Sequence, residues 1–264
     1  MTINDYQNQG VITLNTPVSN SINKLLGGST ISGGDNYTAF LINYDKNNVA
    51  QSSINNSTNA TVHGVSNTNL QVVKGSNNTI YADRDLSFLN GTGKTYAEVN
   101  GTASIFLSDG LNLTLDAFGE NGFVVGDKGG CMINASQSTA NLTLWAYPNN
   151  DALSSLWMFS GSGNTVFSAG TGMSVFSGGN NSSNSFMFVK SSVTGGKTMI
   201  LNFNLNAKNK ISLYQYGLDQ NSLNEILVKA IDVNGNAIIE LENHTIILAG
   251  MSVKDINVNQ FELG

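Results

Sequence analysis

The sequence predicts an all-β protein built as a parallel β-solenoid, and repeated strings of residues carry this prediction. Residues 165–170 (TVFSAG) and 174–179 (SVFSGG) repeat a Val-Phe pair followed by a glycine-containing turn, at an offset of nine residues. Residues 112–118 (NLTLDAF) recur as NLTLWAY 29 positions later. A shorter echo joins FLNG at 88–91 to FLSDG at 106–110, an offset of 18 residues or two nine-residue steps.

Turn signals between these strings recur about every ten residues and delimit short alternating strands. Such a pattern fits a sandwich of hairpins or a solenoid of stacked coils. Similar strings at fixed offsets favour the solenoid, because equivalent side chains then lie above one another in successive coils. Mixed offsets indicate irregular coils and not a perfect β-roll throughout. The turn glycines are Gly91, Gly101, Gly110, Gly119 and Gly129.

Four apolar residues of the nine-residue repeat give this prediction its sharpest form. We expect Val166, Phe167, Val175 and Phe176 to lie in register between neighbouring coils.

Three segments are expected along the chain, namely 1–27, 28–195 and 196–264. The repeats occupy the middle segment. Residues 1–27 lack them and are expected to form a cap, and the strand-like, nearly uncharged stretch 11–22 contains one proline, Pro17. This stretch either caps its own solenoid or pairs with a neighbouring subunit, and we favour the neighbour as a route to a head-to-tail fibre.

The last segment is expected to form a small antiparallel cap. Residues 224–230 predict a short helix, with Asn221 or Ser222 as its N-cap. Asn234-Gly235 lies between two β-rich runs, which is a strong hairpin signal. A third strand-like run follows at 244–250.

The composition limits the partners of the chain. Among 264 residues, 40% are hydrophobic, which supplies a core, whereas only 11% are charged. The surface must therefore be rich in neutral Asn, Ser and Thr, as in repetitive extracellular β proteins. A net charge of −6 and a single arginine, Arg84, exclude nucleic acid and anionic membranes as principal partners. No apolar run approaches the ~20 residues needed for membrane insertion, and the N-terminal residues lack the pattern of a cleavable export signal.

Residues that carry chemistry are scattered. Cys131 is the single cysteine and is expected to be a buried hydrophobe, the alternative being an exposed thiol that forms an intermolecular disulfide. His63 and His244 lack metal-ligand spacing and are expected to be structural. Glu240 and Glu242 alternate with apolar residues and indicate a solvated strand face. We therefore predict no catalytic, cofactor-binding or metal-binding residues and no enzymatic activity.

One glycine-rich stretch superficially resembles a phosphate-binding loop. Residues 91–95 (GTGKT) lack the preceding glycine spacing and a following helix, so this interpretation is rejected.

Two parts of the chain resemble a known family of bacterial proteins. Residues 161–188 and 75–83 resemble the nonapeptide repeats of RTX-type secreted proteins. Residues 197–261 resemble the C-terminal region that often follows such repeats in type I secretion substrates. The resemblance implies export from a Gram-negative bacterium by an uncleaved C-terminal signal, and hence an extracellular or cell-surface location. The matching C-terminal stretches are Leu201–Phe203, Ile211–Leu213, Tyr216-Gly217 and Ile246–Gly250.

The resemblance also implies calcium binding by repeat aspartates, but the residues here differ. Residues 161–182 contain no carboxylate, so we expect no cofactor and at most a minor stabilisation by calcium. The remaining candidates, Asp35, Asp83, Asp85 and Asp109, are expected to be turn residues.

The leading functional hypothesis is a secreted, non-enzymatic structural protein whose partner is itself. It would self-assemble into an extracellular fibre, surface layer or biofilm matrix, because a long β surface with few charges has little defence against association. The alternative is an adhesin or polysaccharide-binding module that uses an aromatic platform of Trp145, Tyr147 and Trp157. A secreted polysaccharide hydrolase or lyase is the third hypothesis.

Overall fold

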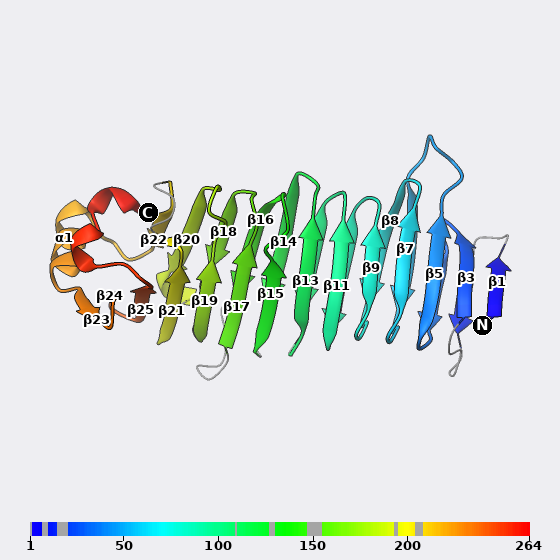
Figure 1. Ribbon diagram of the computed structural model, residues 1–264, viewed down its shortest axis with the longest axis horizontal. Coiled ribbons are helices and arrows are strands. Elements are labelled where there is room, and N and C mark those ends of the chain that lie inside the picture. The colour runs from blue at the N-terminus through cyan, green and yellow to red at the C-terminus, as the bar shows by residue number, and fades with distance from the viewer. Residues whose placement is uncertain are drawn as a thin grey trace. The chain divides into compact units, whose positions relative to one another are not determined.

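The chain folds into two compact units, Met1–Val124 (unit 1) and Val125–Gly264 (unit 2). The computed structural model describes residues 2–6, 10–14, 21–108, 110–126, 130–146, 155–192, 195–203 and 208–264. Each unit is a parallel β-solenoid in which successive strands alternate between two sheets, A and B (Figure 1). The predicted fold class is therefore confirmed.

In unit 1 the odd-numbered strands form sheet A and the even-numbered strands form sheet B, and neighbouring strands pair in parallel. The order is β1-β3-β5-β7-β9-β11-β13 in sheet A and β2-β4-β6-β8-β10-β12 in sheet B. The strands of sheet A are β1 (Thr2–Tyr6), β3 (Ser21–Leu26), β5 (Tyr37–Ile42), β7 (Thr61–Val65), β9 (Thr79–Ala82), β11 (Lys94–Val99) and β13 (Asn112–Ala117). Those of sheet B are β2 (Val11–Leu14), β4 (Thr30–Gly33), β6 (Ala50–Asn55), β8 (Thr68–Val73), β10 (Leu86–Gly91) and β12 (Ala103–Leu107), and β14 (Asn121–Gly126) lies at the unit boundary.

Unit 2 has the same alternation but ends differently. Its sheet A runs β15-β17-β19-β21-β25-β24-β23, of which the last two strands are antiparallel, and its sheet B runs β16-β18-β20-β22-β26. In sheet A the strands are β15 (Cys131–Ala135), β17 (Ser155–Ser160), β19 (Met173–Ser177), β21 (Gly196–Leu201), β23 (Ile231–Val233), β24 (Asn236–Glu240) and β25 (His244–Leu248). In sheet B they are β16 (Asn141–Ala146), β18 (Thr165–Ser168), β20 (Asn184–Val189), β22 (Lys210–Tyr214) and β26 (Phe261–Leu263). The helices are α1 (Gln220–Val228) and the 3₁₀ turns η1 (Lys190–Ser192), η3 (Val253–Asp255) and η4 (Val258–Gln260).

A coil is of irregular length, and in several places it equals or lies close to two of the nine-residue steps. Thr61 pairs with Thr79 on the next strand of the same sheet, an offset of 18 residues. Phe167 on β18 therefore pairs with Phe186, whereas Phe176 on β19 pairs with Met158 and Ile200.

The predicted register of the nine-residue repeat is wrong for this reason. Val166 and Phe167 lie in sheet B, whereas Val175 and Phe176 lie in sheet A, so the repeat joins opposite strands of a coil. The Phe167 and Phe176 rings instead meet in the core, with centroids 5.2 Å apart.

The parallel coils also extend beyond the expected limits at residues 28 and 195. β1 pairs with β3 and β2 with β4, so strands before residue 28 already belong to the coils. β21 and β22 continue the two sheets after residue 195 by pairing with β19 and β20. These strands do not repeat the amino-acid sequence of the nine-residue string. The solenoid boundaries inferred from that string, residues 28 and 195, therefore exclude them.

Alternating burial along each strand builds the core. In β13, Leu113, Leu115 and Ala117 point inward and are fully buried, whereas Thr114 and Asp116 are on the outer side. A parallel coil with one face inward needs this period of two. Larger rings fill the core of unit 2, where Phe167, Phe176 and Phe186 stack within 6.5 Å.

The abundant asparagines have a backbone role at the corners of unit 1. Asn36, Asn59 and Asn77 have positive φ angles of 53°, 51° and 53°, and Gly93 continues this corner at 73°. Each follows a residue in the chain of bridges from Asp35 through Thr58 and Ser76 to Thr92. Asn adopts the left-handed conformation more readily than other residues with a Cβ, so one such residue per coil turns the chain.

The C-terminal end confirms the expected hairpin and corrects the helix. β23 and β24 pair around Asn234-Gly235, whose positive φ angles of 52° and 78° fit a tight two-residue hairpin turn. α1 begins earlier than predicted, because Asp219 is the N-cap and accepts a hydrogen bond from the Ser222 N–H at 2.8 Å. Ser222 is thus the reciprocal partner in a capping box and not the cap itself.

Candidate functional site

A groove of about 540 Å³ hollows the outer face of sheet B in unit 1. It crosses β6, β8, β10 and β12, and two rows of polar side chains line it, because side chains two residues apart on a strand share a face. The strand register places Ser53, Gln71, Ser87 and Ser104 in the first row. The second row consists of Gln51, Asn69, Asp85 and Thr102.

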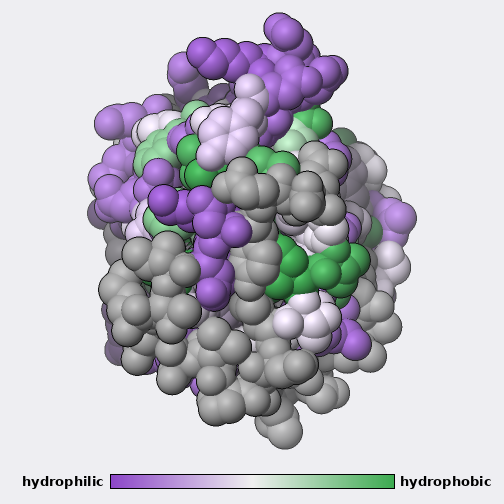
Figure 2. Space-filling model, turned by 90° about the vertical axis from the view of Figure 1, so that its right-hand side faces the viewer, coloured by the Kyte–Doolittle hydropathy of each residue, from purple (hydrophilic) through white to green (hydrophobic). Residues whose placement is uncertain are grey.

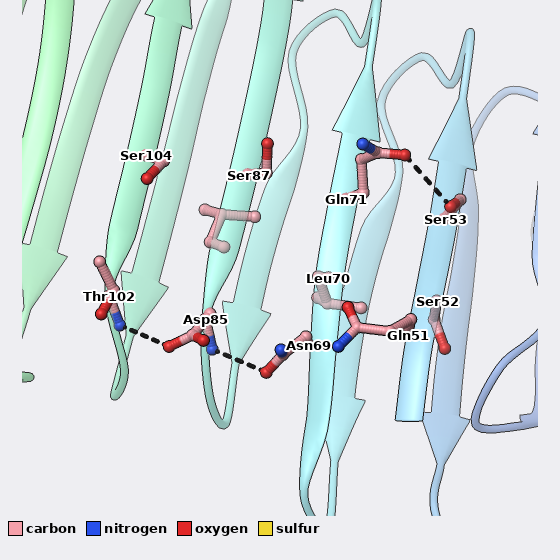
Figure 3. A pocket seen from close by; sticks show the side chains of 11 residues that line it. Gln51, Ser52, Ser53, Asn69, Leu70, Gln71, Asp85, Ser87, Thr102 and Ser104 are labelled. Atoms are coloured by element: carbon pink, nitrogen blue, oxygen red, sulfur yellow. Dashed lines mark hydrogen bonds between the residues drawn. The ribbon is translucent and has the colours of Figure 1, made fainter. Parts of the chain in front are cut away.

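Backbone hydrogen bonds fix the second row at the start of the strands (Figure 3). The Thr102 N–H donates to Asp85 Oδ1 at 2.8 Å, and the Asp85 N–H donates to Asn69 Oδ1 at 3.3 Å. Gly101 leaves room for this carboxylate, since a Cβ there would lie 2.4 Å from Asp85 Oδ1. Asp85 therefore links successive coils and fixes the position of the second polar row of the groove.

Much of the groove lining keeps its hydrogen-bonding capacity. Ser53 and Gln71 are 3.5 Å apart, at the limit of a hydrogen bond. Within the part of the chain that the structure describes, the side chains of Gln51, Ser87 and Ser104 have no hydrogen-bond partner. The groove thus presents amides and hydroxyls toward solvent.

An apolar row borders the polar rows on the same face. Val73, Leu89 and Phe106 follow one another in register on β8, β10 and β12. Phe106 is 42% exposed, and its ring packs edge to face on Phe123 with centroids 5.9 Å apart. The outer face of sheet B therefore combines neutral polar groups with an apolar margin.

The opposite sheet of unit 1 carries an aromatic row. His63 on β7 stacks between Phe40 and Tyr81, with centroids 4.5 Å and 4.7 Å apart and rings nearly parallel. Tyr81 meets Tyr96 edge to face at 5.9 Å. Because ring faces contact one another along the row, mainly ring edges are available to a ligand, and we interpret the row as a stabilising ladder.

The position of His63 predicts a pH dependence of stability. Burial lowers the pKa of His63 below its ordinary value of 6.5. As the pH falls through about 6.5, the unfolded chain takes up the proton first, so stability conferred by the neutral ring is lost. We expect the melting temperature of the wild type to fall more between pH 7.5 and 5.5 than that of His63→Phe, which keeps the stack. Parallel curves from circular dichroism would contradict this expectation.

The candidate calcium ligands are turn residues with protein partners. Asp35 accepts hydrogen bonds from Asn36 and Asn59, both at 2.9 Å, and Asp83 accepts one from the Asn67 N–H. Asp109 lies outside the described residues. Among the residues with a described position, no group of three or more His, Cys, Asp or Glu is arranged to hold a metal ion. The described candidates, Asp35, Asp83 and Asp85, thus do not form the grouped carboxylate site that the RTX resemblance implies.

We therefore expect a chelator to change the melting temperature of purified protein only a little. Scanning calorimetry with EDTA, and again with millimolar calcium, measures this directly. Unfolding in EDTA followed by refolding on calcium addition would contradict the expectation, and Asp109 would then be the first residue to substitute.

The aromatic platform of the alternative hypothesis is not formed by the two tryptophans. Trp145 lies on β16 in sheet B and Trp157 on β17 in sheet A, so they point away from opposite sheets of unit 2. They are 39% and 45% exposed. Tyr147, the third member, lies outside the described residues.

The two carboxylates of the C-terminal hairpin have separate partners. Glu242 forms an ion pair with Lys190 at 2.5 Å, and Glu240 accepts a hydrogen bond from Thr245. Each therefore has a local structural contact.

His244 and Cys131 are both buried. His244 Nε2 lies 2.9 Å from Thr198 Oγ1, in a place where Gly196 allows the ring to approach closely. Burial of Cys131 agrees with the expected small hydrophobe.

The stretch 91–95 also has a plain structural role. β10 ends at Gly91 and β11 begins at Lys94, so a strand and not a helix follows these glycines.

One end of unit 1 has open strand edges. β1 pairs with β3 and β2 with β4, and neither has a second strand partner in the ranges that the structure describes. Figure 2 views this end and shows hydrophobic surface beside hydrophilic surface. β2 (VITL) contains no charged residue, and Val11 on it is 73% exposed. An open, uncharged strand edge such as that of β2 is a template for pairing with another chain.

The opposite end of the strand order, in unit 2, carries a helix and an antiparallel hairpin. α1 packs on β24 and η4 and buries Leu223 completely. β23 then forms the last strand of sheet A through its antiparallel pairing with β24. The two units thus end in different ways.

Within the described ranges, no helix is long and apolar enough to cross a membrane. Neither the protein-family models nor the curated proteins compared with this chain include a match.

Proposed function

We propose that this protein is a secreted, non-enzymatic structural protein that self-associates through the open edge formed by β1 and β2. The observation that carries the proposal is that neither β1 nor β2 has a second strand partner among the residues with a described position, together with the uncharged sequence of β2. Each added strand would satisfy backbone N–H and C=O groups along the edge, and a second copy presents the same edge chemistry. The product would be a fibre, surface layer or biofilm matrix outside the cell, as the RTX resemblance suggests.

The structure changes how such an assembly would be built. The stretch 11–22 was expected to pair with a neighbour, but β2 and β3 are already strands of their own solenoid. Among the described residues, only the outer edges of β1 and β2 are left for pairing with a second copy. Edge-to-edge pairing of two copies would close on a two-fold axis, whereas pairing with the β23 and β26 edges of a second copy would propagate as a fibre.

Two aspartates on the edge strand test the proposal. Val11→Asp with Thr13→Asp places two negative charges on β2. If β2 pairs with β2 of a second copy, the introduced aspartates of the two copies repel each other. If β2 pairs with β26 of a second copy, Glu262 on β26 repels them. The matched control is Ser53→Asp with Asn55→Asp, because these residues continue the same two rows on β6. Sedimentation velocity at rising concentration should show assembly for the wild type and control, and monomers for the edge variant.

A wild type that stays monomeric at high concentration would overturn the proposal, and so would an edge variant that assembles as the wild type does. Circular dichroism of each variant establishes that the fold is kept. Negative-stain microscopy of the wild type then separates closed pairs from fibres.

Polysaccharide binding is the second candidate function, and the groove on sheet B is the observation that favours it. Particle size separates the two, because a binding module needs no assembly. The absence of enzymatic activity stays a prediction.

A further inference from the structure

We propose that the groove on the outer face of sheet B binds a neutral polysaccharide chain. The proposal concerns β6, β8, β10 and β12 and does not depend on self-association through β1 and β2. The occupant is an extended, uncharged polymer of sugar rings, running along the polar rows and thus across the strands.

The polar groups in the groove match sugar hydroxyls. Amide and hydroxyl side chains such as Gln51, Gln71 and Ser87 both donate and accept hydrogen bonds, as each sugar hydroxyl does. Gln51 and Ser87 have no partner among the described residues, so binding a ligand there breaks no internal hydrogen bond. The Ser212 hydroxyl in unit 2, by contrast, is used internally, since it contacts Ser185 at 2.9 Å and Glu262 at 3.1 Å.

The charge of the lining favours a neutral ligand over an anionic one. Lys and Arg are absent from the groove lining, and its single ionisable residue is Asp85. That carboxylate already accepts the Thr102 N–H at 2.8 Å. An acidic polysaccharide or a nucleic acid would meet this negative charge without a compensating cation.

The apolar margin supplies the second half of sugar recognition. Sugar rings carry hydroxyls around their rim and C–H groups on their faces, so their binding sites combine polar groups with apolar surface. Val73, Leu89 and Phe106 run beside the first polar row, and Phe106 is exposed. A ring that hydrogen-bonds the polar rows would therefore place C–H groups against this margin.

The spacing of the rows suits a repeating polymer. Neighbouring strands of a sheet lie about 4.8 Å apart, so equivalent polar groups recur at that interval along the groove. This interval is comparable with the length of one sugar ring in an extended chain. A polymer could then make similar contacts with Gln71, Ser87 and Ser104 in turn.

Native gel electrophoresis through embedded soluble polysaccharides tests the proposal. The neutral probes are hydroxyethylcellulose, laminarin, galactomannan and xylan, and the anionic probes are alginate and polygalacturonate. We expect at least one neutral probe to retard the wild type. Gln51→Ala with Gln71→Ala should weaken that binding about tenfold, because each lost hydrogen bond contributes modestly. Phe106→Ser should weaken it independently through the apolar margin.

Thr61→Ala with Thr79→Ala is the matched control, because these paired residues occupy neighbouring strands on the outer face of sheet A. This control should bind as the wild type does, and circular dichroism should show that every variant is folded. The proposal is overturned if no neutral probe retards the wild type, if only the anionic probes do, or if the groove variant and the control bind equally. Sedimentation of the groove variant should still show the assembly state of the wild type, which keeps this test separate from that of self-association.

Discussion

Replacing Phe186 by alanine is expected to lower the free energy of unfolding of unit 2 by about 3–5 kcal/mol. The side chain is fully buried on β20. Its ring stacks on Phe167 at 5.1 Å and 7°, and contacts Phe176 and Phe203 with centroids 6.5 Å and 5.9 Å apart. Alanine would remove the shared surface of four rings and leave a cavity that the two sheets cannot close without breaking strand pairing.

Urea unfolding followed by tryptophan fluorescence measures this loss, because both tryptophans of the chain, Trp145 and Trp157, lie in unit 2. Met187→Ala is the control, since this neighbour on β20 points outward and is only partly buried. Phe186→Leu should give an intermediate loss. A Phe186→Ala variant as stable as Met187→Ala would show that the aromatic stack does not hold the coils together.

Phe167 and Phe176 also show which part of the fold the sequence can predict. The repeated step and its alternation indicate stacked coils, because both sides of a coil bury one face in the same way. For the same reason the amino-acid sequence of the repeat does not show whether nine residues make half a coil or a whole coil. Only the pairing of Phe167 with Phe186 shows that nine residues lead to the other sheet. The error in register follows from this symmetry between the two sides.

The polar groove could not be predicted from the sequence. Its residues come from four strands at unequal offsets, since Gln71 pairs with Ser87 and Ser87 with Ser104, 16 and 17 residues apart. Gln, Ser and Asn occur throughout this chain, so no motif marks those that face the groove. The available signal was that polar residues occupy the outward-facing, alternate positions of adjacent strands. This pattern becomes visible only once the strand register is known.

The alternation of consecutive strands between the two sheets explains why the two tryptophans do not form a platform. Trp145 and Trp157 are near in sequence and both point outward, but consecutive strands belong to different sheets. Closeness along a solenoid chain thus separates side chains, whereas an offset of about one coil brings them together. His63 and Tyr81, 18 residues apart, stack for that reason.

Gly179 ends the second copy of the nine-residue repeat, and replacing it by alanine is expected to cost about 3 kcal/mol or more. A Cβ at this position would lie 1.8 Å from the carbonyl oxygen of Gly161, and one at Gly161 would lie 2.1 Å from the carbonyl oxygen of Ser138. The obstacles are backbone atoms of the coil beneath, which cannot move aside as a flexible side chain can. The second copy of the repeat therefore ends in glycine because successive coils touch at Gly179 through their backbones.

Gly130→Ala is the matched control in unit 2, because the nearest atom to its Cβ is the Ser155 carbonyl oxygen at an ordinary 3.4 Å. Neither Gly130 nor Gly179 has a positive φ angle, so conformational strain does not distinguish them and the difference isolates the close approach of the coils. Tryptophan fluorescence in urea should show Gly130→Ala unfolding close to the wild type and Gly179→Ala at a far lower concentration. Coincident transitions would mean that the coils separate easily at this corner. The glycine would then serve the turn alone, and the contact between stacked backbones would contribute little to the stability of the solenoid.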